Sequence, residues 1–231
     1  MNTTGTPSVA PPSNLQKELD MLLARFLAEV PEEVAGSLQK ATRQIAESGV
    51  AEQCLQAGML APDFTLPDQH GQPVSLSALL VAGPVVVSFY RGGWCPFCGL
   101  ELDSLQAYLA DIRRLGAQLL AISPQTAAQT RATAETHQLA FPVLSDTGNK
   151  VARQFGLVYA LPQMLRPIYL SFGIDLPLHN DDRSYDLPVP ATYVIDSSGI
   201  IRLAFANADY SKRLEPGRIL DSLREPGRIN N

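Results

Sequence analysis

Two cysteines three positions apart, Cys95 and Cys98, are the residues of this chain best suited to chemistry. They directly follow the apolar run 84–90, so the pattern predicts that they lie where a buried strand gives way to a helix. Free N–H groups and the dipole at a helix start lower the pKa of a thiol, and the thiolate is the form that attacks disulfides and peroxides. The pair is therefore a candidate redox disulfide, with Cys95 and Cys98 as its catalytic residues.

A Cys-x-x-Cys pair can instead form half of a zinc site, which needs two further ligands at suitable spacing. The residues left to supply them form no second paired motif: Cys54, His70, His137 and His179. Two inert core cysteines are the other alternative. We expect no metal and no other cofactor, and we expect Cys54 to be a semi-buried bystander in a helical stretch.

The composition predicts one globular domain with an appendage. The chain has 231 residues, of which 45% are hydrophobic and 18% are charged, enough to bury a sizeable core. Three cysteines are too few for a disulfide-stapled secreted scaffold, so a reducing, cytoplasmic location is expected. The net charge of −5 argues against a nucleic-acid partner. No run of about 20 apolar residues predicts a membrane span, and no signal peptide is evident.

The N-terminal part divides into a tail and a helical extension. Residues 1–14, rich in Thr, Ser and Pro, are expected to be disordered. Residues 15–55 form the extension, with one amphipathic helix ending near Pro31 and a second from about 31 to 49. This pair of helices either packs on the main domain or makes a dimer contact.

From residue 56 to 225 short apolar strands alternate with helices, which is typical of an α/β sheet. Between 156 and 187 no period is evident, and such insertions often build binding surfaces. The last residues, 226–231, are expected to be a tail. The predicted elements are strands at 63–66, 85–90, 118–123, 141–144, 192–195 and 200–206, the last two as a hairpin, and helices from about 96 to Gly116, at 126–137, 149–155 and 216–223.

Five short motifs occur in the order in which one known family carries them. They are Ala61-Pro62-Asp63-Phe64-Thr65-Leu66, Phe89-Tyr90-Arg91-Gly92-Gly93-Trp94-Cys95-Pro96-Phe97-Cys98, Ala121-Ile122-Ser123-Pro124, Phe141-Pro142-Val143-Leu144-Ser145-Asp146 and Ala191-Thr192-Tyr193-Val194-Ile195-Asp196. The chain resembles the alkyl hydroperoxide reductase and thiol-specific antioxidant family, the peroxiredoxins, over about residues 56–225. The resemblance implies a thioredoxin fold, a central mixed sheet flanked by helices. It also implies reduction of hydroperoxides by a cysteine that passes through a sulfenic acid.

The chain departs from the peroxiredoxin pattern Pro-x-x-x-Thr-x-x-Cys. A gap-free count places Arg91 at the proline, Cys95 at the threonine and Cys98 at the attacking cysteine. Glu101 then matches an acidic residue three positions further on. The family's arginine before a later strand falls at Pro190 and is absent.

The same replacements resemble thioredoxins, which carry Trp-Cys-x-x-Cys and a cis-proline facing the dithiol. That alignment makes Cys95 the attacking thiolate, Cys98 the resolving thiol and Pro190 the cis-proline. The two resemblances thus assign opposite roles to the two cysteines, and both orders are compatible with a cycle from sulfenate to disulfide.

Four residues are expected to support the dithiol. Arg91 either stabilises a thiolate or alkoxide or is a solvated charge. Trp94 packs beside the pair, and Glu101 either relays a proton or only favours the helix start. Pro190 is the cis-proline of the thioredoxin-like alignment.

The expected function is a thiol-dependent peroxidase that reduces hydrogen peroxide or organic hydroperoxides and is re-reduced by thioredoxin or a similar thiol donor. The alternatives are a thioredoxin-like protein disulfide oxidoreductase and a binding module in which the cysteine pair is regulatory. The resemblance also implies a homodimer.

Overall fold

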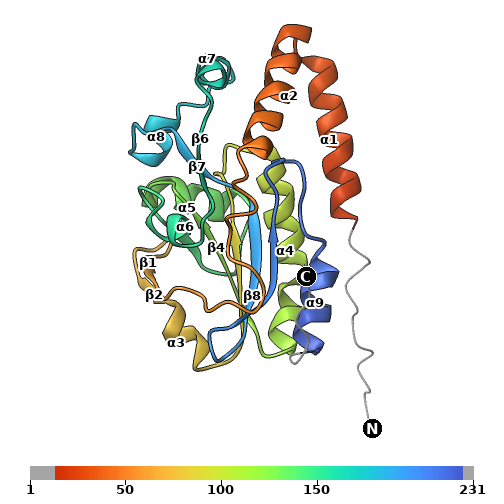
Figure 1. Ribbon diagram of the computed structural model, residues 1–231. Coiled ribbons are helices and arrows are strands. Elements are labelled where there is room, and N and C mark those ends of the chain that lie inside the picture. Colours follow the sequence, from red (N-terminus) through yellow and green to blue (C-terminus); the bar gives the residue numbers. More distant parts are fainter. Residues whose placement is uncertain (1–13, 226–231) are drawn as a thin grey trace.

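The computed structural model describes residues 14–225 and is built around a mixed five-stranded sheet in the order β5-β4-β3-β8-β9 (Figure 1). Strand β3 (Val85–Phe89) lies at its centre, parallel to β4 (Gln118–Ser123), which in turn pairs in parallel with β5 (Val143–Ser145). On its other side β3 pairs antiparallel with β8 (Ala191–Ile195), and β8 forms the predicted hairpin with β9 (Ile201–Ala206). The predicted thioredoxin-fold sheet is therefore confirmed. The predicted tails lie outside the described residues, apart from Asn14.

Every residue of β3 is buried, because the sheet is covered on both faces. Alternate side chains point to opposite faces, so Val86 joins one apolar cluster while Val85 and Val87 join another. Helix α4 (Pro96–Arg114) packs on the first face with α9 (Pro216–Arg224). The packed sheet thus fixes the position of the end of β3 and of the loop that follows it.

Two helices, α1 (Leu15–Glu29) and α2 (Glu32–Glu47), form the N-terminal extension and project past one end of the sheet (Figure 1). The start of α1 is docked on the domain through buried Leu15 and Leu19. In addition, the Gln16 N–H donates to the Glu215 carboxylate over 2.9 Å. The extension therefore packs on its own domain, which is the first of the two predicted alternatives.

Cys54 lies in turns after α2, not in a helix, and only 3% of it is exposed. Its thiol donates to the Val50 carbonyl at 3.2 Å, and burial raises its pKa to about 11. The expectation of a semi-buried helical position is therefore wrong, because the chain turns at Gly49 and folds back under the sheet. Cys54 is an inert thiol near neutral pH.

The segment 156–187 is more regular than the sequence suggested. It opens and closes with the antiparallel pair β6 (Val158–Ala160) and β7 (Asp186–Pro188). Between these strands lie a 3₁₀ turn (Gln163–Leu165), α7 (Arg166–Ser171) and α8 (Leu176–Asn180). These elements are too short to produce a visible hydrophobic period, and α7 lies at the same end of the molecule as α2 (Figure 1). The remaining elements are β1 (Thr65–Pro67), β2 (Pro73–Ser75), α3 (Leu76–Leu80), α5 (Ala127–Thr136) and α6 (Lys150–Gln154).

Candidate active site

The two cysteines lie at the point where β3 passes into α4. Cys95 is the N-cap residue of α4, with extended backbone dihedrals, and Cys98 lies in the first turn, where its N–H donates to the Cys95 carbonyl at 3.0 Å. The connecting loop is fixed by Gly93, whose N–H donates to the Gln125 side chain at 2.8 Å. A Cβ at Gly93 would lie 2.2 Å from the Thr133 hydroxyl, so only glycine fits there. The loop thus presents Cys95 in a defined position.

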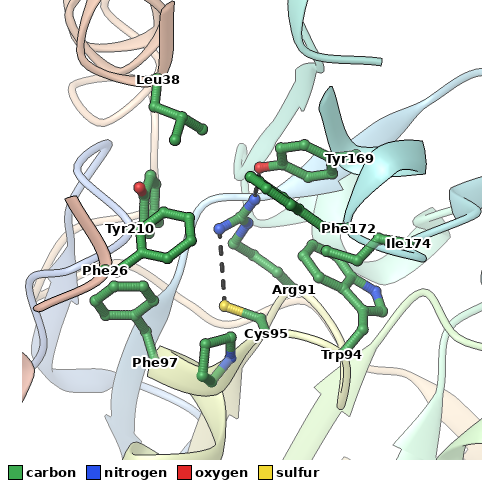
Figure 2. A pocket seen from close by; sticks show the side chains of 11 residues that line it. Phe26, Leu38, Arg91, Trp94, Cys95, Phe97, Tyr169, Phe172, Ile174 and Tyr210 are labelled. Atoms are coloured by element: carbon green, nitrogen blue, oxygen red, sulfur yellow. Dashed lines mark hydrogen bonds between the residues drawn. The ribbon is translucent and has the colours of Figure 1, made fainter. Parts of the chain in front are cut away.

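Cys95 is 2% exposed, and its sulfur faces a cationic group. The Arg91 Nη1 donates to Cys95 Sγ over 3.7 Å (Figure 2). Burial alone would raise the pKa of this thiol, but a hydrogen bond donated by Cys98 and the charges of Arg91 and Arg213 outweigh it and lower the pKa well below that of an ordinary thiol. Cys95 is therefore a thiolate at neutral pH.

Arg91 is a buried residue and not the solvated charge that was one alternative. Its guanidinium lies 4.7 Å from the ring centre of Tyr210, 5.0 Å from that of Trp94 and 5.7 Å from that of Tyr169, and it also donates to the Tyr169 hydroxyl. Within residues 14–225 no carboxylate is paired with this cation, so the Cys95 thiolate is the anion next to it.

Cys98 has a different environment one helical turn away. It is fully buried, and its sulfur accepts a hydrogen bond from Arg213 Nη2 at 3.4 Å. Burial and the neighbouring Cys95 thiolate raise its pKa well above that of an ordinary thiol. Cys98 is thus a protonated thiol placed to donate a hydrogen bond to Cys95.

Glu101 forms a buried ion pair with Arg213, whose Nε donates to the carboxylate at 2.6 Å. The hydroxyl of Thr192 on β8 approaches the same carboxylate at 3.5 Å. Burial raises the pKa of Glu101 to about 7, against the opposing charge of Arg213. Glu101 therefore joins α4, β8 and the loop before α9, and it orients Arg213 toward Cys98.

The structure brings Arg91, Trp94, Cys95 and Cys98 together as the sequence indicated, with Glu101 behind them. Pro190 differs from its prediction. The described part of the chain has no cis peptide bond, so the cis-proline assignment is wrong. Pro190 is buried just before β8, and its carbonyl accepts a hydrogen bond from the Asn207 N–H at 3.3 Å. This arrangement forms with a trans peptide bond at Pro190.

Sequence reasoning missed three functional candidates, namely Arg213, Tyr169 and Tyr210. Arg213 lies 115 positions from Cys98, in a loop without a motif, so no spacing indicated the contact. Tyr169 and Tyr210 come from the segment 156–187 and from the loop after β9. An aromatic residue in an irregular segment was the only signal available.

Above Cys95 lies a cavity of about 340 Å³ (Figure 2). Its floor is the start of α4, and its walls come from α1, α2, the segment containing α7 and the loop after β9. The lining residues are Phe26, Leu38, Arg91, Trp94, Cys95, Pro96, Phe97, Tyr169, Phe172, Ile174 and Tyr210. Cys95 is thus the sulfur that a small molecule entering the cavity meets.

A thiolate facing a cavity, with a protonated thiol one turn behind it, can perform a two-step oxidation. The first sulfur takes an oxygen atom from a peroxide, and the second displaces it to form a disulfide. Within residues 14–225 no cluster of three or more His, Cys, Asp or Glu side chains is arranged to hold a metal ion. Among the described helices, none has the length and apolar character needed to cross a membrane.

A family model and similar curated proteins point to the same family. The model of the AhpC/TSA family matches residues 57–204. The chain is 33% identical over 150 residues to the chloroplastic peroxiredoxin Q of Sedum lineare, which covers 65% of this chain and 68% of that protein. It is 31% identical over 165 residues to the corresponding protein of Triticum aestivum, covering 71% of this chain and 65% of the relative. The chain therefore spans about two thirds of the length of these relatives.

Among solved structures, the peroxidoxin BcpB of Mycobacterium tuberculosis is similar, with a TM-score of 0.58 and 26% identity. The match covers 74% of this chain and 97% of that one. The helices α1 and α2 precede the residues that the family model matches, and Tyr210 and Arg213 follow them. Part of the site described above thus lies outside the shared region.

Proposed function

Because the chain belongs to the AhpC/TSA family, we propose that it is a thiol-dependent peroxidase in which Cys95 attacks the hydroperoxide and Cys98 resolves the product. One observation carries the assignment of roles: Cys95 faces the cavity beside an arginine that has no carboxylate partner within residues 14–225. Cys98 lies beneath it, fully buried and protonated. This order is that of the thioredoxin-like alignment, on a peroxiredoxin chain.

In the first step, the Cys95 thiolate attacks the outer oxygen of the hydroperoxide. An S–O bond forms, the O–O bond breaks, and the electron pair leaves with the other oxygen as an alkoxide or hydroxide, which takes up a proton to give an alcohol or water. Arg91 stabilises the thiolate before the step and lies next to the leaving oxygen during it.

In the second step, the sulfur of Cys98 attacks the sulfenic acid of Cys95. The S–S bond forms and the S–O bond breaks, and the released hydroxide takes the thiol proton of Cys98 as water. Arg213 lies on Cys98 Sγ, where it favours the thiolate that this attack requires.

An external thiol donor then reduces the disulfide by thiol–disulfide exchange, for which thioredoxin or a similar dithiol is our proposal. The family assignment does not favour the disulfide oxidoreductase alternative. We place the reaction in the cytoplasm on the strength of the low cysteine content, whereas the plant relatives carry the description chloroplastic. A homodimer stays a prediction from the family resemblance.

A single-turnover experiment tests the proposal. The fully reduced protein is mixed with excess hydroperoxide, followed by Trp94 fluorescence and by mass spectrometry of the thiols, for wild type, Cys95→Ser and Cys98→Ser. We expect Cys95→Ser to lose at least about 10⁴-fold in rate, as loss of a nucleophile does. Cys98→Ser should be oxidised once, quickly, and stop at the sulfenic acid.

Cys54→Ser is the matched control, because its thiol is buried away from the site and should leave the rate unchanged. Fast oxidation retained by Cys95→Ser and lost by Cys98→Ser would reverse the two roles. A wild-type rate no greater than that of a free thiol would remove the peroxidase assignment.

A further inference from the structure

The walls of the cavity above Cys95 come largely from parts of the chain that are added to the sheet. Phe26 of α1 and Leu38 of α2 precede the residues that the family model matches, and Tyr210 follows them. The opposite wall is formed by the segment after α7, with Phe172 and Ile174. The N-terminal extension and the segment 156–187 thus meet over the reactive sulfur.

The two additions touch each other directly. The rings of Phe26 and Phe172 pack edge to face with their centres 5.7 Å apart, and Phe172 is 40% exposed, as expected for a residue at the rim. Deeper in the cavity Tyr169 packs edge to face on Trp94 at 5.7 Å. The walls are therefore aromatic from the rim to the floor.

The polar groups of the cavity are concentrated at its floor. Of the eleven lining residues Arg91 is the only cationic side chain, and it lies against Cys95 (Figure 2). Its Nη1 lies 3.7 Å from Cys95 Sγ, so the cation is next to the sulfur that a bound peroxide meets. The cavity thus has an apolar body and a single cationic point beside the nucleophile.

We propose that this cavity selects hydroperoxides that carry a bulky apolar group, aromatic or branched, over hydrogen peroxide, with Phe26, Phe172 and Ile174 as specificity-determining residues. The inference rests on the proposed function and adds its substrate class. The peroxide end of such a molecule lies at Cys95 and Arg91, and its apolar body displaces water from the aromatic walls. Hydrogen peroxide has no apolar body and gains nothing from the walls.

The chemistry is that of the first step above. The Cys95 sulfur takes the outer oxygen, the O–O bond breaks, and the electron pair stays on the oxygen bound to the apolar group. That alkoxide accepts a hydrogen bond from Arg91 and then a proton, and it leaves as the bulky alcohol.

The test compares second-order rate constants for oxidation of reduced protein by cumene hydroperoxide, tert-butyl hydroperoxide and hydrogen peroxide. We expect wild type to favour cumene hydroperoxide over hydrogen peroxide by about 10-fold or more, the scale of discrimination by an apolar pocket. Phe172→Ala and Ile174→Ala should each lower the ratio of the cumene hydroperoxide rate to the hydrogen peroxide rate by about 5- to 20-fold. Phe172→Leu should restore part of the preference.

Leu170→Ala is the matched control, because Leu170 is an exposed apolar residue of α7 that does not line the cavity. Urea unfolding of each variant shows separately that it is folded. Equal fast rates for all three peroxides, or equal effects of Leu170→Ala and Phe172→Ala, would overturn the inference and leave the peroxidase function standing. Slow rates with every peroxide would instead remove the function itself.

Discussion

The two sulfurs of this site lie one helical turn apart, each beside a buried arginine, and yet they differ in ionisation. Arg91 at Cys95 is surrounded by aromatic rings and has no carboxylate partner within residues 14–225, so its charge acts on the thiolate. Arg213 at Cys98 is already paired with Glu101. Burial disfavours the charged form of both thiols and so raises the pKa of each. Only at Cys95 do the neighbouring hydrogen bond and positive charges outweigh burial and lower the pKa.

The comparison teaches that the number of arginines near a cysteine is a poor guide to which cysteine reacts. Among the neighbours that lower the pKa of Cys95, the hydrogen bond from Cys98 comes first, and the charge of Arg91, which no carboxylate within residues 14–225 neutralises, comes next. The two arginines come from different loops. Arg91 lies in the loop before α4, whereas Arg213 lies in the loop before α9 and forms an ion pair with Glu101 inside the domain.

Breaking the pair on the Cys98 side should have the larger effect on the fold. Arg213→Gln leaves the Glu101 carboxylate buried without its cation and should lower the free energy of unfolding by about 3–5 kcal/mol. The double variant Arg213→Gln with Glu101→Gln should recover most of that loss, since neither charge is then left alone. Urea unfolding of the reduced proteins measures both values.

The exposed pair Arg224 and Asp221 provides the control, because Arg224→Gln at the surface should cost no more than about 1 kcal/mol. If the single and double variants lost the same stability, Glu101 and Arg213 would not be coupled, and the contrast between the two arginines would weaken.

Removing the charge on the Cys95 side should have a smaller effect on the fold and a specific effect on the chemistry. Arg91→Gln should raise the pKa of Cys95 and slow its oxidation by about 10²-fold, as loss of a group that stabilises developing charge does. Arg91→Lys keeps the charge and should retain a lower pKa than Arg91→Gln. Thiolate absorbance against pH and single-turnover rates measure the two effects.

Arg166→Gln is a suitable control for this variant. The Arg166 guanidinium also stacks on a tyrosine, 4.1 Å from the ring centre of Tyr185, but it does not line the cavity. An equal slowing by Arg166→Gln and Arg91→Gln would show that loss of stacking, and not loss of charge at the sulfur, is responsible.

The pH dependence sharpens the same contrast with the smallest change to the protein. The pKa of Cys95 is lowered in the folded state, so its thiolate persists as the pH falls below the value of about 8.5 for a free thiol. The oxidation rate should therefore stay level through neutral pH and fall only as the pH drops through the lowered pKa. Cys98 and Cys54 stay protonated over that range. A rate that already declines below about pH 8.5 would contradict the assignment.

The sequence predicted the sheet and the position of the dithiol because both depend on local patterns. The buried run of β3 and the Cys-x-x-Cys spacing at a helix start are visible in a few consecutive residues. The partners of the two sulfurs were harder to foresee. Arg91 was named with two alternatives, and Arg213 was not named, since its contact with Cys98 depends on how the loop before α9 packs.

The residues that form the walls of the cavity could not be predicted either, because they too come together only through the packing of distant segments. Phe172 lies in a segment of short helices with no hydrophobic period, and Phe26 lies on a helix whose face alone does not reveal what it covers. Pro190 shows the opposite risk, since a motif borrowed from thioredoxins suggested a cis bond that the turn before β8 does not require.

The lone cation beside Cys95 has a consequence for the reduction potential of the site. Arg91 stabilises the thiolate of the reduced form, whereas the proposed disulfide would leave the cation without that anion. A dithiol whose reduced form is stabilised in this way has a less negative potential and is a stronger oxidant. In the proposed cycle, a Cys95–Cys98 disulfide should therefore be easily reduced by thiol donors, and the dithiol should return readily to the form that meets the next peroxide.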